Sequence, residues 1–132
     1  MAKMLKITVT KKEEGVLVIA PVGPIDSSTY MDLEAKIDLL LKKPVKIIMI
    51  DMGGVDYISS MGLGVIFKTK KAVESNKGNL IMINLQPQIQ MVFDIIKALP
   101  SINVFANMEE VDNYLSNIQR KEKEKIKGED KK

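Results

Sequence analysis

Two adjacent serines, Ser59 and Ser60, lie in the stretch "DYISSMGLG" (56–64), at the point where a helix is predicted to begin. A serine nucleophile needs a neighbouring base to take its proton, and histidine is the usual base. The chain contains no histidine and no cysteine. We therefore expect the serines to cap a helix, to receive a group from another protein, or to do both.

The residues and motifs that other kinds of catalysis require are also missing from the sequence. Asp51 and Asp56 could form a carboxylate pair for magnesium binding or acid–base work, but we favour a strand-end aspartate and a turn aspartate. The sequence has no G-x-G-x-x-G fingerprint, no phosphate-binding G-x-x-x-x-G-K-[ST] loop and no G-x-S-x-G elbow. Cysteine and histidine are the usual ligands of structural zinc, so their absence argues strongly against such a site. We expect no enzyme activity, no metal and no cofactor.

The start of a helix suits both roles of the serines. A serine at the N-cap stabilises a helix by roughly 1 kcal/mol relative to alanine. The free N–H groups and the positive end of the helix dipole also tolerate a phosphoryl group, which adds about −1.5 to −2 charges. Gly62 and Gly64 leave little side-chain bulk beside the serines, which would let another protein approach. The alternative for either glycine is close packing of the helix on a sheet.

Hydrophobic periodicity predicts the elements that position this segment. Alternation over 5–10 predicts a strand, 11–15 a hairpin turn, and 16–22 the partner strand. Helical spacing or short apolar runs then predict helices over 26–43, 60–76, 87–99 and from Asn107 onward, and strands over 45–51, 79–85 and 102–105. Asp26, Ser27 or Ser28 is expected to cap the first helix, and Asn107 with Glu110 to form a capping box on the last.

This order predicts an α/β fold: a largely parallel sheet of about five strands with an antiparallel N-terminal edge and about four helices. Sites in such sheets form at the carboxyl ends of strands. Two loops qualify, 21–26 and 51–60.

Charge separates a neutral domain from a basic tail. The chain has 20 basic and 17 acidic residues, and residues 120–132 hold seven of the first and four of the second. Residues 1–119 are therefore neutral, which argues against a nucleic-acid-binding face on the domain. We expect one domain over 1–119 and a flexible charged tail over 120–132. No apolar run is long enough for a membrane span, so we expect a soluble cytoplasmic protein that is monomeric when free.

The whole pattern resembles the STAS domain of bacterial anti-sigma factor antagonists. The resemblance rests on "G-x-x-D" (Gly23 to Asp26) after a hairpin, a strand ending at Asp51, "YISSMGLGVIF", and a helix of the form "P-x-[IV]-x-x-[IVM]-[FL]" from Pro87. It covers roughly residues 4–118. The family's usual loop reads D-S-[ST/A]-G-[LA]-G, so this chain has Ser59 in place of the aspartate and Met61 in place of a small residue.

The resemblance implies partner switching. The domain would bind an anti-sigma factor that is also a serine kinase and would release the sigma factor. Phosphorylation at Ser60, or alternatively Ser59, would weaken that contact, and a serine phosphatase would restore it. The partner-binding residues carried over by the resemblance are Gly23, Asp26, Ser27, Asp56, Ser59, Ser60, Met61, Gly62, Leu63 and Gly64.

Two alternatives stay open. The protein could be a STAS adaptor that holds a partner without phosphorylation, in a transport or signalling complex, because "SSMG" departs from the family's loop. It could instead be a small-molecule binder or a weak enzyme at the Asp26 and Asp51 end of the sheet, and a ligand would then stabilise the fold.

Overall fold

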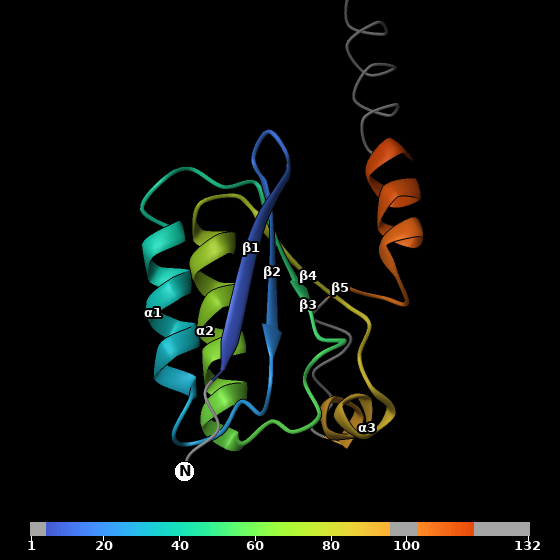
Figure 1. Cartoon of the computed structure of the whole chain (residues 1–132). Helices are drawn as coiled ribbons and strands as arrows, with labels where there is room; N and C mark the ends of the chain where they lie inside the picture. Colours follow the sequence, from blue (N-terminus) through green and yellow to red (C-terminus); the bar gives the residue numbers. More distant parts are fainter. Residues whose placement is uncertain (1–4, 96–102, 118–132) are drawn as a thin grey trace, which may run out of the picture.

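A five-stranded mixed sheet forms the centre of the computed structural model, which describes residues 5–95 and 103–117 (Figure 1). The strand order is β1-β2-β3-β4-β5, with β1 antiparallel to β2 and all other neighbours parallel. The elements are β1 (Lys6–Glu13), β2 (Val16–Val22), α1 (Tyr30–Leu40), β3 (Ile47–Asp51), α2 (Ser60–Ser75), β4 (Asn79–Ile83), α3 (Pro87–Ile95) and β5 (Asn103–Phe105), followed by a helix over 108–117. The predicted fold is confirmed.

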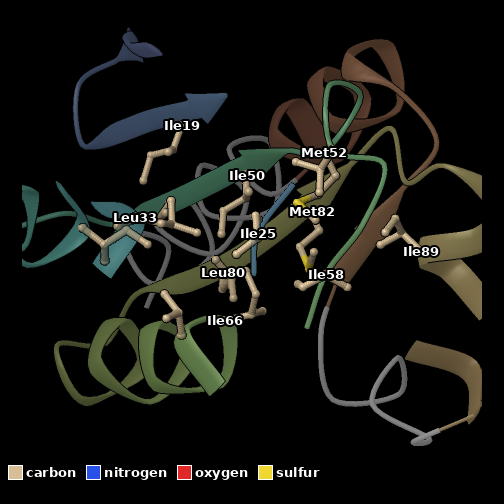
Figure 2. Close-up of a cluster of buried hydrophobic side chains, with 14 of the residues drawn as sticks. Ile19, Ile25, Leu33, Ile50, Met52, Ile58, Ile66, Leu80, Met82 and Ile89 are labelled. Atoms are coloured by element: carbon tan, nitrogen blue, oxygen red, sulfur yellow. The ribbon is translucent and has the colours of Figure 1, made fainter. Parts of the chain in front are cut away.

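The central strands are apolar because both faces of the sheet are covered. In β3, Ile48 and Ile50 belong to the larger core, which includes residues of α1 and α2, while Ile47 and Met49 face the smaller one. The helix over 108–117 closes that second face. Figure 1 shows α1 and α2 on one side of the sheet and this last helix on the other. Figure 2 shows the larger core, where side chains from strands and helices pack together.

Several predicted boundaries are wrong, among them the hairpin turn and both ends of the first helix, which ends at Leu40 and not at residue 43. The hairpin turn is only Glu14–Gly15, not 11–15, because β1 continues to Glu13 through a register shift and Gly15 adopts a positive φ of 79°. Helix α1 begins at Tyr30 after Thr29, and no side chain caps it, so the predicted capping by Asp26, Ser27 or Ser28 is also wrong. These polar residues form a turn of their own instead, because short side chains compete with the helix for backbone N–H groups.

The last helix has part of its predicted capping box. The side chain of Asn107 accepts from Glu110 N at 3.0 Å, as predicted. The carboxylate of Glu110 accepts from Ala106 N at 2.8 Å instead of from Asn107 N. The predicted end of the third helix at residue 99 and the tail over 120–132 lie outside the described residues.

Candidate functional site

The two predicted site loops lie side by side at the carboxyl end of the sheet. We call residues 23–29 the aspartate loop and residues 52–59 the serine loop. Gly23 N donates to Gly54 O at 2.9 Å, Ile25 N to Tyr57 O at 2.9 Å, and Ser59 N to Ile25 O at 2.8 Å. The loops therefore continue the pairing of β2 with β3 beyond the regular strands, and each fixes the position of the other.

Gly62 permits this arrangement. A Cβ at Gly62 would lie 2.6 Å from Ile25 Cγ2, 2.9 Å from Ile58 Cγ1 and 3.0 Å from the carbonyl oxygen of Ile25. Ile25 and Ile58 are both buried in the core shown in Figure 2. Gly64 differs, since a Cβ there would meet nothing within 4 Å. Close packing thus explains Gly62, which is itself buried, whereas Gly64 leaves an open surface on the helix.

The two serines have different surroundings. Ser59 is the N-cap of α2, and its Oγ accepts from Gly62 N at 3.2 Å. It is half-buried, and its own N–H is bonded to the aspartate loop. Ser60 is the first residue of the helix and is exposed, and its hydroxyl has no hydrogen-bond partner among residues 5–95 and 103–117. The hydroxyl of Ser59 therefore stabilises the start of α2, whereas the hydroxyl of Ser60 is exposed and makes no hydrogen bond within the described part of the chain.

Large apolar side chains are exposed next to Ser60. Met61 follows it in the first turn of α2 and is 48% exposed, and Tyr57 in the serine loop is 54% exposed. Asp56 is exposed and Leu63 is half-buried. A partner that covers Ser60 would therefore also cover apolar surface. The centre of a protein interface is commonly apolar in this way.

Asp26 orders the aspartate loop. Its Oδ1 accepts from Ser28 Oγ at 2.7 Å and from Ser28 N at 2.8 Å, and these bonds hold the pKa of the carboxyl below its usual range. The buried Thr29 donates to Pro24 O at 2.7 Å and accepts from Asp26 N at 2.9 Å. Ser27 is exposed on this turn. Sequence reasoning missed Thr29, although the run "DSST" was the signal for a polar turn.

Asp51 is a structural aspartate of the kind we favoured. Its Oδ1 accepts from Gly53 N at 2.9 Å and from Asn84 Nδ2 at 3.1 Å. Within the described part of the chain, no group of three or more acidic residues could hold a metal ion. The carboxylate therefore ties the end of β3 to the loop after β4.

Three side-chain amides, which sequence reasoning also missed, bond the end of β3 and the serine loop that follows it. We call residues 84–88 the amide segment. Asn84 donates to Asp51, Gln86 Nε2 donates to Gly53 O at 2.9 Å, and Gln88 Nε2 donates to Asp56 O at 3.1 Å. The sequence signal was the polar run "NLQPQ" directly after a buried strand. The serine loop is thus held between the aspartate loop and the amide segment.

The carboxyl end of the sheet is acidic. The segments 21–33, 50–67 and 84–95 contain five acidic residues and no lysine or arginine; the acidic residues are Asp26, Asp32, Asp51, Asp56 and Asp94. Lys6 on the edge strand β1 pairs with Val22 nearby. A phosphate on Ser60 would add to an already negative surface. Among the helices described, none is both long and apolar enough to cross a membrane.

A central mixed sheet with paired loops at its carboxyl end, one of which leads into a helix at Ser60, is the arrangement expected of a STAS domain. The model of the STAS domain family matches residues 8–111. The chain belongs to this family, as the sequence pattern predicted.

Relatives and solved structures agree with this assignment. BtrV of Bordetella bronchiseptica, a candidate anti-sigma factor antagonist, is 33% identical over 106 residues, covering 80% of this chain and 90% of BtrV. An anti-sigma-B factor antagonist of Staphylococcus epidermidis is 28% identical over 89 residues, covering 66% and 82% of the two chains. The anti-sigma factor antagonist SpoIIAA of Bacillus, in its unphosphorylated form, has a TM-score of 0.68 at 19% identity over 84% of this chain and 98% of that chain. Its phosphorylated form has also been solved and gives a TM-score of 0.67 at 20% identity, over 83% and 99%.

Proposed function

We propose that this protein is a cytoplasmic anti-sigma factor antagonist that is switched off by phosphorylation of Ser60. In its unphosphorylated form it binds an anti-sigma factor through the aspartate loop, the serine loop and the first turn of α2, and the sigma factor is released. The names of the relatives BtrV and the anti-sigma-B factor antagonist support this role. The kinase is the anti-sigma factor, which binds ATP and transfers its γ-phosphoryl group to the serine, leaving ADP, and a serine phosphatase hydrolyses the phosphoserine.

The observation that carries the proposal is the contrast between the two serines. Ser59 uses its hydroxyl to cap α2, while Ser60 stands exposed with its hydroxyl free among the described residues. Phosphorylating Ser60 leaves the cap of the helix in place. The first-turn N–H groups and the helix dipole favour a negative group at that position, so the modified domain stays folded.

The surroundings of Ser60 explain how a phosphate would release the partner. The proposed contact includes the exposed Tyr57 and Met61, which lie three residues before and one residue after Ser60 in the chain. A phosphate on Ser60 would have to be desolvated within this contact, which costs binding free energy. Phosphorylation therefore opposes the contact without altering the fold.

Mapping the phosphate tests the proposal. Wild type, Ser60→Ala, Ser59→Asp and Ser27→Ala would be incubated with lysate of the native cells and labelled ATP. Ser59→Asp removes the hydroxyl but keeps an acceptor for the N-cap, and Ser27→Ala removes another exposed serine of the same surface. We expect label on wild type, Ser59→Asp and Ser27→Ala, and none on Ser60→Ala.

Other outcomes contradict the proposal in distinct ways. Label that persists on Ser60→Ala and disappears from Ser59→Asp would place the acceptor at Ser59. A complete absence of label, in a lysate that phosphorylates another antagonist of this family, would refute the switch. The protein would then act as an adaptor that binds its partner without phosphorylation.

A further inference from the structure

A lysine-lined basin lies at the end of the sheet opposite the serine loop. It has two adjoining lobes of about 510 and 580 Å³ between the β1–β2 turn, the α1–β3 connection and the α2–β4 turn. Figure 1 shows these three turns together at the end of the sheet away from the serine loop. Each lobe falls within the range of about 300–1,000 Å³ that is usual for small-molecule sites.

The rim of the basin is basic. Lys42, Lys43, Lys46 and Lys77 line it and are exposed, and none of them forms a salt bridge within the described part of the chain. The remaining charged pair on the rim, Lys11 and Glu14, neutralises itself at 2.8 Å. The pKa of the Glu14 carboxyl is lowered, first by the hydrogen bond from Lys11 and in smaller part by the charge of Lys46. Four lysines are thus left to meet an anion.

The floor of the basin is apolar. Leu17, Leu40 and Val45 line one lobe together with Pro44, and Leu39 stands at its edge with 57% of its surface exposed. Lys42 and Lys43 line both lobes, whereas Lys46 and Lys77 line only the other lobe. A basic lobe that adjoins an apolar one matches a ligand that has two parts. A simple anion such as phosphate would leave this apolar surface in contact with water.

Backbone hydrogen bonds preform the basin. Gly15 O accepts from Lys46 N at 2.8 Å and from Ile47 N at 3.0 Å, and Lys46 O accepts from Asn79 N at 2.8 Å. A Cβ at Gly78 would lie 2.7 Å from Lys46 O, so the α2–β4 turn packs directly on the α1–β3 connection. The three walls therefore keep their positions without a ligand, which lowers the conformational cost of binding one.

We propose that this basin binds an amphipathic anion, with a phosphate or carboxylate head at the lysine rim and an alkyl chain on the leucine floor. The same chemistry is offered by a free alkyl phosphate and by an anionic lipid at a membrane surface. Because the basin and the serine loop are at opposite ends of the sheet, both can be occupied at once.

Titration of the full chain with decyl phosphate below its micelle concentration tests this site, with amide chemical shifts as the readout. We expect saturable shifts around residues 14–15, 41–46 and 76–77, and none around residues 56–64. Inorganic phosphate and decanol, which supply one part of the ligand each, should bind at least tenfold more weakly. Lys42→Gln combined with Lys43→Gln should weaken decyl phosphate binding about tenfold or more, and Leu39→Gln several-fold.

A matched control pair is Lys6→Gln with Lys71→Gln, which removes two exposed lysines outside the basin. The affinity of this double variant for decyl phosphate should stay within about twofold of that of wild type. Equal weakening by the control pair would mean a non-specific charge effect, and inorganic phosphate binding as tightly as decyl phosphate would refute the amphipathic ligand; either result overturns the proposal.

Vesicles distinguish the two sources of the ligand. If wild type sediments with phosphatidylglycerol vesicles but not with phosphatidylcholine vesicles, and decyl phosphate competes, the head group belongs to a membrane lipid. If decyl phosphate binds and vesicles do not, the ligand is a free molecule. Binding of a polyglutamate peptide without any binding of decyl phosphate would assign the basin to an acidic protein segment and refute our proposal.

Discussion

Replacing Gly62 with alanine should destabilise the protein, although alanine is the better helix former. The new Cβ would lie 2.6 Å from Ile25 Cγ2, and Ile25 has no exposed surface through which it could move away. The new Cβ would also lie 3.0 Å from the backbone oxygen of Ile25, so a shift toward that oxygen would not relieve the clash. Overpacking of this kind costs about 1–3 kcal/mol, and the gain in helix propensity returns at most about 1 kcal/mol. We expect a net loss of about 1–2 kcal/mol in the free energy of unfolding.

Gly64→Ala is the matched control. It lies two residues further along the same helix, and its Cβ would meet nothing within 4 Å. Only the propensity gain remains, so this variant should be more stable than wild type by about 0.5–1 kcal/mol. Replacing glycine with alanine should therefore lower the free energy of unfolding at residue 62 and raise it at residue 64.

Urea denaturation monitored by circular dichroism measures the free energy of unfolding of both variants. We expect the urea midpoint to shift and the dependence of the free energy on urea concentration to stay constant. The Gly62→Ala substitution should also disturb the hydrogen bond between Ser59 N and Ile25 O, and with it the presentation of Ser60. Slower phosphorylation of Gly62→Ala than of Gly64→Ala would reflect this. If Gly62→Ala proves as stable as Gly64→Ala, the packing of Ile25 against α2 is not the constraint that we describe.

Three further predictions concern the loops. Ser59→Ala should lower the free energy of unfolding by about 1 kcal/mol and Ser59→Asp should restore it, which urea midpoints would show; an Asp variant as unstable as Ala would argue against the N-cap role. Asn84→Gly removes the hydrogen bond from the Asn84 side chain to Asp51 and should lower the free energy of unfolding by about 1 kcal/mol. Asn84→Ala should lower it by about 1–2 kcal/mol more, because Asn84 has a φ of 59°, which alanine adopts less readily than glycine. Equal midpoints for the two Asn84 variants would refute that ordering. The lowered pKa of Asp26 means that its ionised form stabilises the fold above about pH 4, and that this contribution is lost as the pH falls through the folded-state pKa. The stability advantage of wild type over Asp26→Asn should therefore shrink between pH 6 and the acid limit of unfolding experiments, and an advantage that grows on acidification would contradict the assignment.

The central elements were predictable because their sequence pattern has one physical solution. The apolar runs in β3 and β4 can be buried only if both faces of the sheet are covered, and the structure covers both. Periodic helices between them then require parallel strands joined by crossovers. The start of α1 was predicted wrongly because the side chains of Asp26, Ser28 and Thr29 can form hydrogen bonds in a helix cap or in a turn. The local hydrogen bond from Thr29 to Pro24 O favours the turn.

The site was predictable in part. The absence of histidine and cysteine led us to expect no serine catalysis, and the position of Ser59 and Ser60 at the start of a helix indicated the two roles that the serines could share. The sequence placed both loops at the carboxyl end of the sheet, since parallel strands align their ends. It left open which serine caps the helix and which glycine is required for packing.

Those distinctions depend on residues far apart in the chain. Gly62 is constrained by Ile25, the serine loop is bonded by Gln86 and Gln88, and the lysine basin collects three separate turns. Local sequence determines hydrophobic period, capping capacity and net charge, because each depends on neighbouring residues alone. Distances between side chains brought together by the sheet are decided only when the core packs, so the exposed Ser60 and the buried Gly62 could be told apart only in the tertiary structure.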